Sequence, residues 1–171
     1  MENLHKVKHS EIPAFLDVTP STDTPSYKIA GNFQTAGDRT YEATESEENY
    51  INEDGATTDV ESYKVSLDEN EMKCVKGDPV FDYVDGLRYN LATGTAAETT
   101  VLLVDKYEYT DEEGTIKYRA QKFKCSISIS KQSRQGGEIS KITYKVNCNG
   151  DPTNGTVTIT GGVPTFTPNA A

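Results

Sequence analysis

The strongest restriction on the fold comes from residues 99–130, whose pattern is that of two long β-strands joined by a tight turn. Residues 99–110 are rich in Val, Leu and Tyr, and the acidic turn Asp111–Gly114 precedes a second apolar stretch over 115–130. Strands usually have about 5–6 residues, so both of these are unusually long. Long strands leave exposed edges that something must cover. Association with identical copies, which continues the sheet from one copy to the next, would cover them.

The apolar alternation changes phase within the second of these strands. Apolar residues occupy even-numbered positions before the change and odd-numbered positions after it: Ile116, Tyr118 and Ala120, then Phe123, Cys125, Ile127 and Ile129. Because successive side chains of a strand point to opposite faces, we expect a bulge or bend near Gln121 and Lys122 that swaps the buried face, as at the corner of a barrel.

Residues 77–94 show a different period, that of an amphipathic helix. Asp78 is the expected N-cap, Pro79 suits the first helical position, and Gly94 is the expected left-handed C-terminal stop. The apolar stripe at helical spacing consists of Val80, Phe81, Val84, Leu87 and Leu91. We therefore predict one helix over about residues 79–92, laid on a sheet.

Residues 34–58 form a long acidic segment with few aliphatic side chains. Between Asp38 and Glu71, twelve residues are acidic and only Arg39 and Lys64 are basic. The difference between these two counts equals the net charge of −10. A solvated acidic loop is one interpretation; an acidic surface that repels polyanions or docks on a basic neighbour is the other. Compact domains rarely contain so long a structureless loop without a function, so we expect a protruding loop or long hairpin that orders against a neighbour.

These patterns predict one domain over residues 1–171. Residues 1–11 form an N-terminal arm and residues 167–171 a small polar tail. Because strands are segregated from a single helix, we expect a mainly β fold, an antiparallel β-sandwich or barrel with one flanking α-helix.

No complete catalytic or metal-binding set is present in the sequence. His5 and His9 lie four residues apart without a third ligand, and no nucleophile elbow or Gly-rich phosphate loop occurs. Cys74, Cys125 and Cys148 are odd in number and widely spaced, so we expect buried free thiols. The sequence therefore predicts neither enzyme activity nor a cofactor.

The expected compartment follows from the lack of long apolar segments in the sequence. No apolar run approaches the ~20 residues needed to cross a bilayer, and the first ten residues hold no hydrophobic signal segment. We therefore expect a cytosolic protein with no membrane insertion.

The order and spacing of several short motifs over about residues 25–166 resemble those of major tail (tube) proteins of long-tailed siphophages of Gram-positive bacteria. The motifs that carry the resemblance are Tyr50–Ile51, Val60–Ser66, Gly77–Val84 with Leu87–Arg88, Tyr118–Ala120 and Asn149–Pro152 followed by Gly155–Val157.

The resemblance implies a tail-tube-like subunit. Members of that family form hexameric rings that stack into a hollow tail tube, which conducts genomic DNA into the host. The long loop of the family reaches an adjacent ring, and here this role falls to residues 34–58. The candidate contact residues are Tyr41, Glu42, Glu45, Glu47, Glu48, Tyr50, Ile51, Glu53 and Asp54.

The resemblance also implies partners and a location. The partners are further copies of the chain, the tape-measure, tail-terminator and distal-tail proteins, and DNA that passes transiently and without sequence specificity. The location is the virion tail, and the bacterial host cytoplasm during assembly.

Two other classes of function stay open on the sequence. One is a sugar- or protein-binding β-sandwich module of a virion or surface protein, although the tyrosines lie mostly in the expected strands and helix and not in loops. The other is an enzyme on a β-barrel, which the absence of a catalytic set disfavours.

Overall fold

The computed structural model describes residues 4–52 and 54–170 and shows a mainly β protein. About 60% of the residues lie in strands of an antiparallel sheet, and there is one α-helix. The strands are β1 (Ala14–Asp17), β2 (Tyr27–Ile29), β3 (Gln34–Glu48), β4 (Thr57–Lys73), β5 (Glu98–Glu112), β6 (Thr115–Ser133), β7 (Lys141–Thr160) and β8 (Val163–Pro168). The helices are α1 (Pro79–Tyr89) and the short 3₁₀ turns η1 (His9–Glu11) and η2 (Gly94–Ala97).

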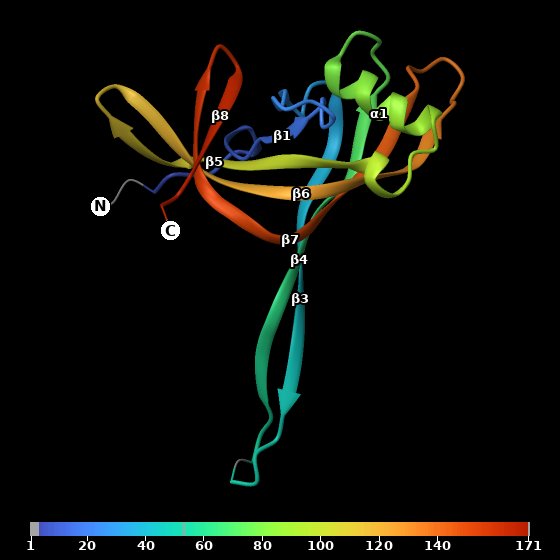
Figure 1. The fold of residues 1–171 in the computed structure, drawn as a ribbon. Helices are drawn as coiled ribbons and strands as arrows, with labels where there is room; N and C mark the ends of the chain where they lie inside the picture. The colour runs from blue at the N-terminus through green and yellow to red at the C-terminus, as the bar shows by residue number, and fades with distance from the viewer. Residues whose placement is uncertain (1–3, 53, 171) are drawn as a thin grey trace.

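The strands form a single open sheet. Their order is β2-β1-β5-β6-β7-β4-β3, and β8 pairs with β7. The sheet is not closed, so the sandwich or barrel expected from the sequence is not confirmed. Figure 1 shows β5, β6 and β7 crossing the body of the molecule, α1 above them, and the β3–β4 hairpin projecting far below.

The core lies on both faces of β5. Val101 and Leu103 belong to a cluster that includes the buried face of α1, whereas Leu102 and Val104 belong to a second cluster with residues of β1, β2, β6 and β7. Successive side chains of a strand point to opposite faces, so the sheet is covered on two sides here. This explains why all four residues are buried.

The swap of the buried face in β6 is confirmed. Ala120 packs in the second cluster, whereas Phe123 and Cys125 pack in the first. The expected bulge of this strand at Gln121 and Lys122 is wrong: β6 pairs with β5 without a shift from Arg119 to Ser126. The register between β6 and β7 shifts between Lys122 and Lys124, but the extra residues lie on β7. The buried face changes because both faces of the sheet are covered.

The helix begins as the sequence predicts. The carboxylate of Asp78 accepts a hydrogen bond from the backbone N–H of Phe81 at 2.9 Å and so caps the first turn. Val80, Phe81, Val84 and Leu87 are all buried.

The predicted end of the helix is wrong. The helix stops at Tyr89, and Leu91, expected on the packed stripe, is 82% exposed. Leu91 itself takes the left-handed conformation (φ 47°), and the N–H of Ala92 bonds the carbonyl of Leu87, the arrangement of a Schellman stop. Gly94 therefore does not end the helix; it begins η2 with φ 58°.

The acidic segment 34–58 is not an irregular loop: it forms β3 and the tip of a long hairpin with β4. β3 and β4 pair from Gln34 with Met72 to Glu48 with Thr57. At the ends of the chain, η1 lies within the predicted N-terminal arm, and β8 extends to Pro168, inside the predicted tail. Residues 1–3 and 171 of those predicted segments lie outside the described residues.

Candidate assembly surface

The outer part of the β3–β4 hairpin leaves the body of the molecule as a ribbon of two strands (Figure 1). β4 pairs with β7 only over Ser66–Lys73, so within the described residues its segment 57–65 pairs with β3 alone. We call residues 40–65 the arm. A two-stranded ribbon is at best marginally stable in water, which makes the composition of its two faces informative.

One face of the arm carries most of its apolar side chains, with Glu45 and Glu47 on the same face toward the tip. Tyr41 lies opposite Val65, Ala43 opposite Tyr63, and Glu45 opposite Val60, and side chains of directly opposed residues share a face. We call Tyr41, Ala43, Val60, Tyr63 and Val65 the apolar stripe. Tyr41, Val60 and Tyr63 are at least half exposed, so the stripe faces solvent in the single chain.

The apolar stripe continues the core of the body. Along β4, Leu67 is 6% exposed, Val65 is half-buried and Tyr63 is 63% exposed. The alternation therefore runs on past the point where the residues that the structure describes cover it. An apolar surface of this kind, rimmed by polar groups, is typical of an interaction site.

The opposite face of the arm is polar. Its opposed pairs are Glu42 with Lys64, Thr44 with Ser62, and Ser46 with Asp59. The two faces thus differ sharply in composition.

The tip of the arm carries further exposed side chains. Ile51 is fully exposed and Tyr50 is half exposed. The hydroxyl of Tyr50 donates a 2.7 Å hydrogen bond to Glu48, which raises the pKa of Tyr50. Asp54 is exposed, and Glu53, also a candidate, lies outside the described residues.

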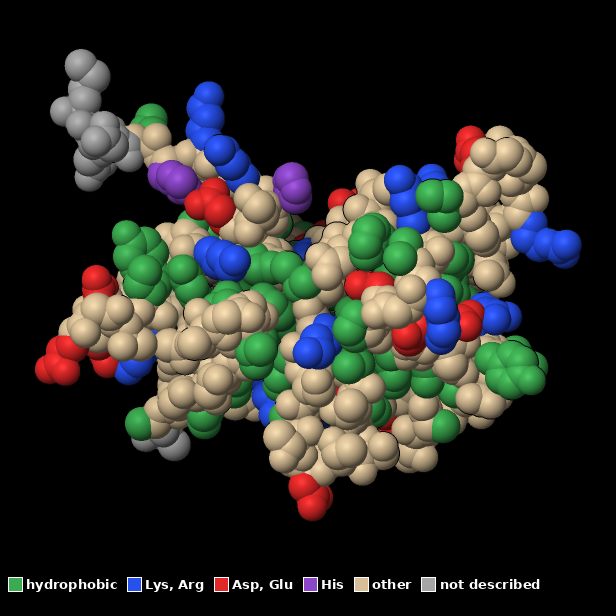
Figure 2. All heavy atoms as spheres, turned by 90° about the horizontal axis from the view of Figure 1, so that it is seen from above, with side chains coloured by type: hydrophobic (Ala, Val, Ile, Leu, Met, Phe, Trp, Pro, Cys, Tyr) green, Lys and Arg blue, Asp and Glu red, His purple; other side chains and the backbone are tan. Residues whose placement is uncertain are grey.

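The arm is acidic and has few basic neighbours in its own copy: Lys64 lies opposite Glu42, and Lys145 interacts electrostatically with Glu42. Among the described residues no salt bridge engages Glu42, Glu45, Glu47, Glu48, Asp54, Asp59 or Glu61. On the upper surface of the body, by contrast, Lys and Arg side chains lie interspersed with Asp and Glu (Figure 2). Residues 40–65 hold eight acidic residues and one basic residue, so most of the net charge of −10 lies on the arm.

The root of the arm is an irregular piece of sheet held by buried polar groups. The register shifts between Leu67 and Asn70, and Glu69 has φ 51°. The side-chain amide of Asn70 donates to the carbonyls of Leu67 and Tyr144 at 2.8 and 3.1 Å and accepts from Gln34 at 2.9 Å. A buried amide with these bonds fixes the bulge, because the carbonyls would otherwise lack partners.

The sequence pattern missed two parts of this surface. It gave Tyr41 as a candidate contact residue. It did not indicate that Tyr41 shares a face with Tyr63 and Val65. The signal was present as period-two spacing in both halves of the segment. The root residues Asn70 and Arg39 carry no sequence signal, because their partners lie 26 or more residues away or in an unpredictable bulge.

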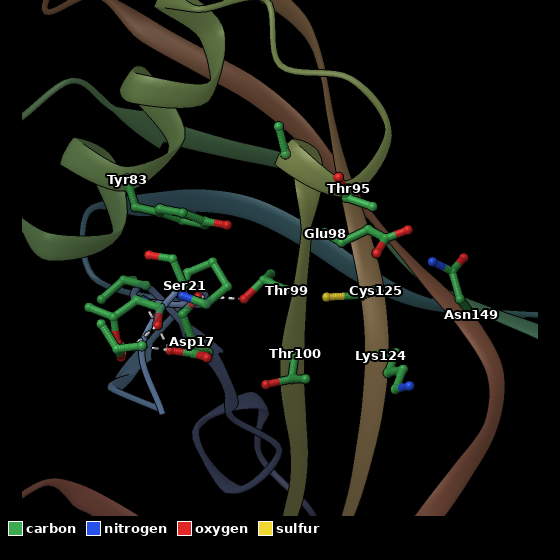
Figure 3. Close-up of a pocket in the computed structure, with 15 residues that line it drawn as sticks. Asp17, Ser21, Tyr83, Thr95, Glu98, Thr99, Thr100, Lys124, Cys125 and Asn149 are labelled. Atoms are coloured by element: carbon green, nitrogen blue, oxygen red, sulfur yellow. Dashed lines mark hydrogen bonds between the residues drawn. The ribbon is translucent and has the colours of Figure 1, made fainter. Parts of the chain in front are cut away.

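An open pocket of about 950 Å³ lies beside α1. Figure 3 shows Tyr83, Thr99 and Cys125 around it, with Asp17 at the end of β1 and Ser21 in the loop that follows. The buried carboxylate of Asp17 accepts from the N–H groups of Thr19 and Ser26 and so holds that loop. Burial raises the pKa of the Cys125 thiol far above its usual range, so that this thiol is a poor nucleophile.

The comparisons add no relative. No family model matches the chain, and no curated protein matches it. Over residues 4–52 and 54–170, no helix has the length and apolar character to cross a membrane, and no three His, Cys, Asp or Glu side chains gather as a metal ion would require.

Proposed function

We propose that the chain is a structural subunit that assembles with copies of itself through the arm. The observation that carries the proposal is the apolar stripe, an extension of the core alternation that its own chain leaves uncovered. Covering it with another copy would remove apolar surface from water, the main driving force of protein association.

The assembly that fits these features best is a tail tube of the siphophage kind. In this proposal hexameric rings stack into a hollow tube, and the arm of one ring contacts the next. The arm leaves the body in one direction (Figure 1). In this proposal it contacts a different surface of the next copy, and a contact between two different surfaces is heterologous. Contacts of that kind build open stacks or rings and not closed dimers.

The long sheet supports the same proposal. The register pairs Lys124 with Asn149, Ser126 with Asn147 and Ser128 with Lys145, on the face opposite the buried Cys125 and Ile127. In a tube, such polar sheet faces from all copies would form one barrel-like wall along which DNA passes without sequence-specific contacts. The tape-measure, tail-terminator and distal-tail proteins would be its other partners, in the virion tail after assembly in the host cytoplasm.

The test is a pair of double substitutions on the two faces of the arm. Tyr63→Ser with Val60→Ser removes apolar side chains from the stripe, whereas Ser62→Ala with Thr44→Ala changes the opposite face. We expect rings or tubes of the unaltered protein and of the second variant in electron micrographs. We expect the first variant to sediment as a folded monomer. Normal tubes from the first variant would refute the role of the stripe.

A shortened arm gives a stronger version of the same test. Glu42 and Lys64 are opposed, so residues 43–63 can be replaced by Asn-Gly, which favours a two-residue hairpin turn. Deletion of residues 40–56 alone would remove most of β3 and leave the outer half of β4 without its partner strand. The replacement of residues 43–63 is therefore the better test. We expect the shortened protein to fold and to stay monomeric at every concentration tested.

The alternative function is a sugar- or protein-binding module, which the open pocket in Figure 3 favours. The polar residues Ser21, Lys124 and Asn149 line that pocket and suit a polar ligand. A strict monomer that binds glycans, and loses binding on Asn149→Ala, would support this module over the tube.

A further inference from the structure

Arg39 makes contacts that its place in the sheet does not predict. It lies on β3, the last strand of the sheet, yet its guanidinium bonds Asp105 of β5 at 3.0 Å and the carbonyl of Val104 at 3.1 Å. The same group donates to the carbonyls of Ile12 and Pro13 at 2.8 and 2.9 Å. The Arg39 side chain is only 13% exposed.

These contacts join two separated parts of the sheet. β6, β7 and β4 lie between β5 and β3 in the strand order, and no backbone pairing joins β3 to β1 or β5 within the described residues. The Arg39 side chain spans this opening. Asp105 on the far side also bonds Arg119 at 3.1 Å, and Arg119 in turn lies over the ring of Tyr107.

Arg39 also stands where the arm becomes regular. The pairing of β3 with β4 shifts between Gln34 and Ala36 and again between Ala36 and Asp38, and then runs without a shift to Thr44. Together with the bulge at Glu69, these shifts leave the ladder at the root irregular. The direction of the arm therefore needs an additional constraint at its first regular residues.

We propose that Arg39 is the positioning residue that fixes the direction of the arm and so presents the apolar stripe in one orientation to the next copy. The inference rests on the proposed function for its consequence, but its structural part concerns the monomer. Arginine suits the role because its planar fork donates several hydrogen bonds at fixed angles, and charge-assisted bonds are stronger than neutral ones. A lysine at this position has only three N–H donors on a single nitrogen, so it could not bond Asp105 and all three carbonyls together.

The experiment measures arm direction and assembly separately. Spin labels on cysteines replacing Ser62 in the arm and Ser128 in the body, in a Cys74→Ser background, report a distance distribution in the dilute monomer. Sedimentation at rising concentration reports self-association. The variants are Arg39→Met, which keeps the apolar stem, Arg39→Lys, and Arg119→Met as the matched control on the other side of Asp105.

We expect Arg39→Met to broaden the distance distribution while amide exchange in β5, β6 and β7 stays as in the parent. If the competent orientation is then occupied about a tenth of the time, the apparent affinity between copies falls about tenfold. Arg39→Lys should restore part of both properties, and Arg119→Met should change them little.

Arg39→Met with a parental distance distribution overturns the inference, whatever the protein assembles into. Failure of the parent protein to assemble overturns the proposed function instead, and leaves the distance measurement as a valid test of Arg39. If Arg39→Met does not fold, Asp105→Asn takes its place, because it keeps the three carbonyl bonds. A broadened distribution in that variant supports the inference, and an unchanged one counts against it.

Discussion

The two halves of β4 carry apolar side chains on one continuous face, across the bulges of the strand, but differ in what surrounds them. Over Ser66–Lys73 the strand lies between β3 and β7, and Leu67 and Met72 are buried. Over residues 57–65 it has β3 alone, and Tyr63 and Val60 are exposed. The pattern of apolar residues therefore extends further than the core of one chain. We take the outer half to be the part of the strand whose partner is another copy.

If this comparison is right, the body should respond to substitutions as a packed core does, and the arm of the monomer should not. Leu87→Asp places an unpaired charge at the buried contact of α1. We expect it to lower the free energy of unfolding by at least about 3–5 kcal/mol, a large part of the 5–15 kcal/mol typical of a domain. Chemical denaturation followed by circular dichroism measures the change.

Two matched variants sharpen that result. Leu91→Asp changes an exposed side chain just beyond the helix. Tyr63→Asp changes an exposed side chain on the arm. Both should change the stability of the dilute monomer by less than about 0.5 kcal/mol. A large loss for Tyr63→Asp would mean that the arm is part of the folded core.

Gly155→Ala probes the body at a close approach of two strands. A Cβ at this position would lie 2.3 Å from the carbonyl oxygen of Thr167 and 2.7 Å from the ring of Phe166. We expect a loss of about 1–3 kcal/mol, as for an overpacked core, measured by thermal unfolding. Gly136→Ala, with no atom within 4 Å of the added carbon, is the control and should leave the melting temperature unchanged.

Gly86→Ala should stabilise the body. Gly86 lies inside α1, and an added Cβ meets nothing within 4 Å, so close packing does not require a glycine here. Alanine should then raise the free energy of unfolding by up to about 1 kcal/mol. A decrease, measured by the same denaturation assay, would show that the helix needs the glycine.

The smallest expected effect is a pH dependence at the root of the arm. The hydrogen bond from Lys141 to Glu71 at 2.6 Å, with one from Thr35, lowers the pKa of Glu71. A lowered folded-state pKa contributes stability above the unfolded pKa of about 4.3, and this contribution is lost as the pH falls through the folded value. Glu71→Gln should flatten the stability profile below about pH 4; an unchanged slope there would remove Glu71 from the root.

Part of this structure could be predicted from the sequence, because its signals are local. Asp78 and Pro79 indicate the start of α1, and the apolar alternation over residues 99–130 predicts β5 and β6. The end of α1 could not be predicted, since Leu91 adopts a left-handed conformation that favours glycine. The open sheet and the contacts of Arg39 could not be predicted either, because they join residues far apart in the chain.

Amide hydrogen exchange of the arm as a function of protein concentration tests the self-association of the arm most directly. In the dilute protein, residues 58–65 should exchange quickly at the amides that point away from β3, because those amides have no ladder partner. On assembly the same amides, including those of the stripe residues around Tyr63, should become protected from exchange. The amides of Leu67 and Met72 should stay protected at every concentration. Rapid exchange over 58–65 at every concentration, including in any rings or tubes that form, would contradict the claim that another copy covers the arm.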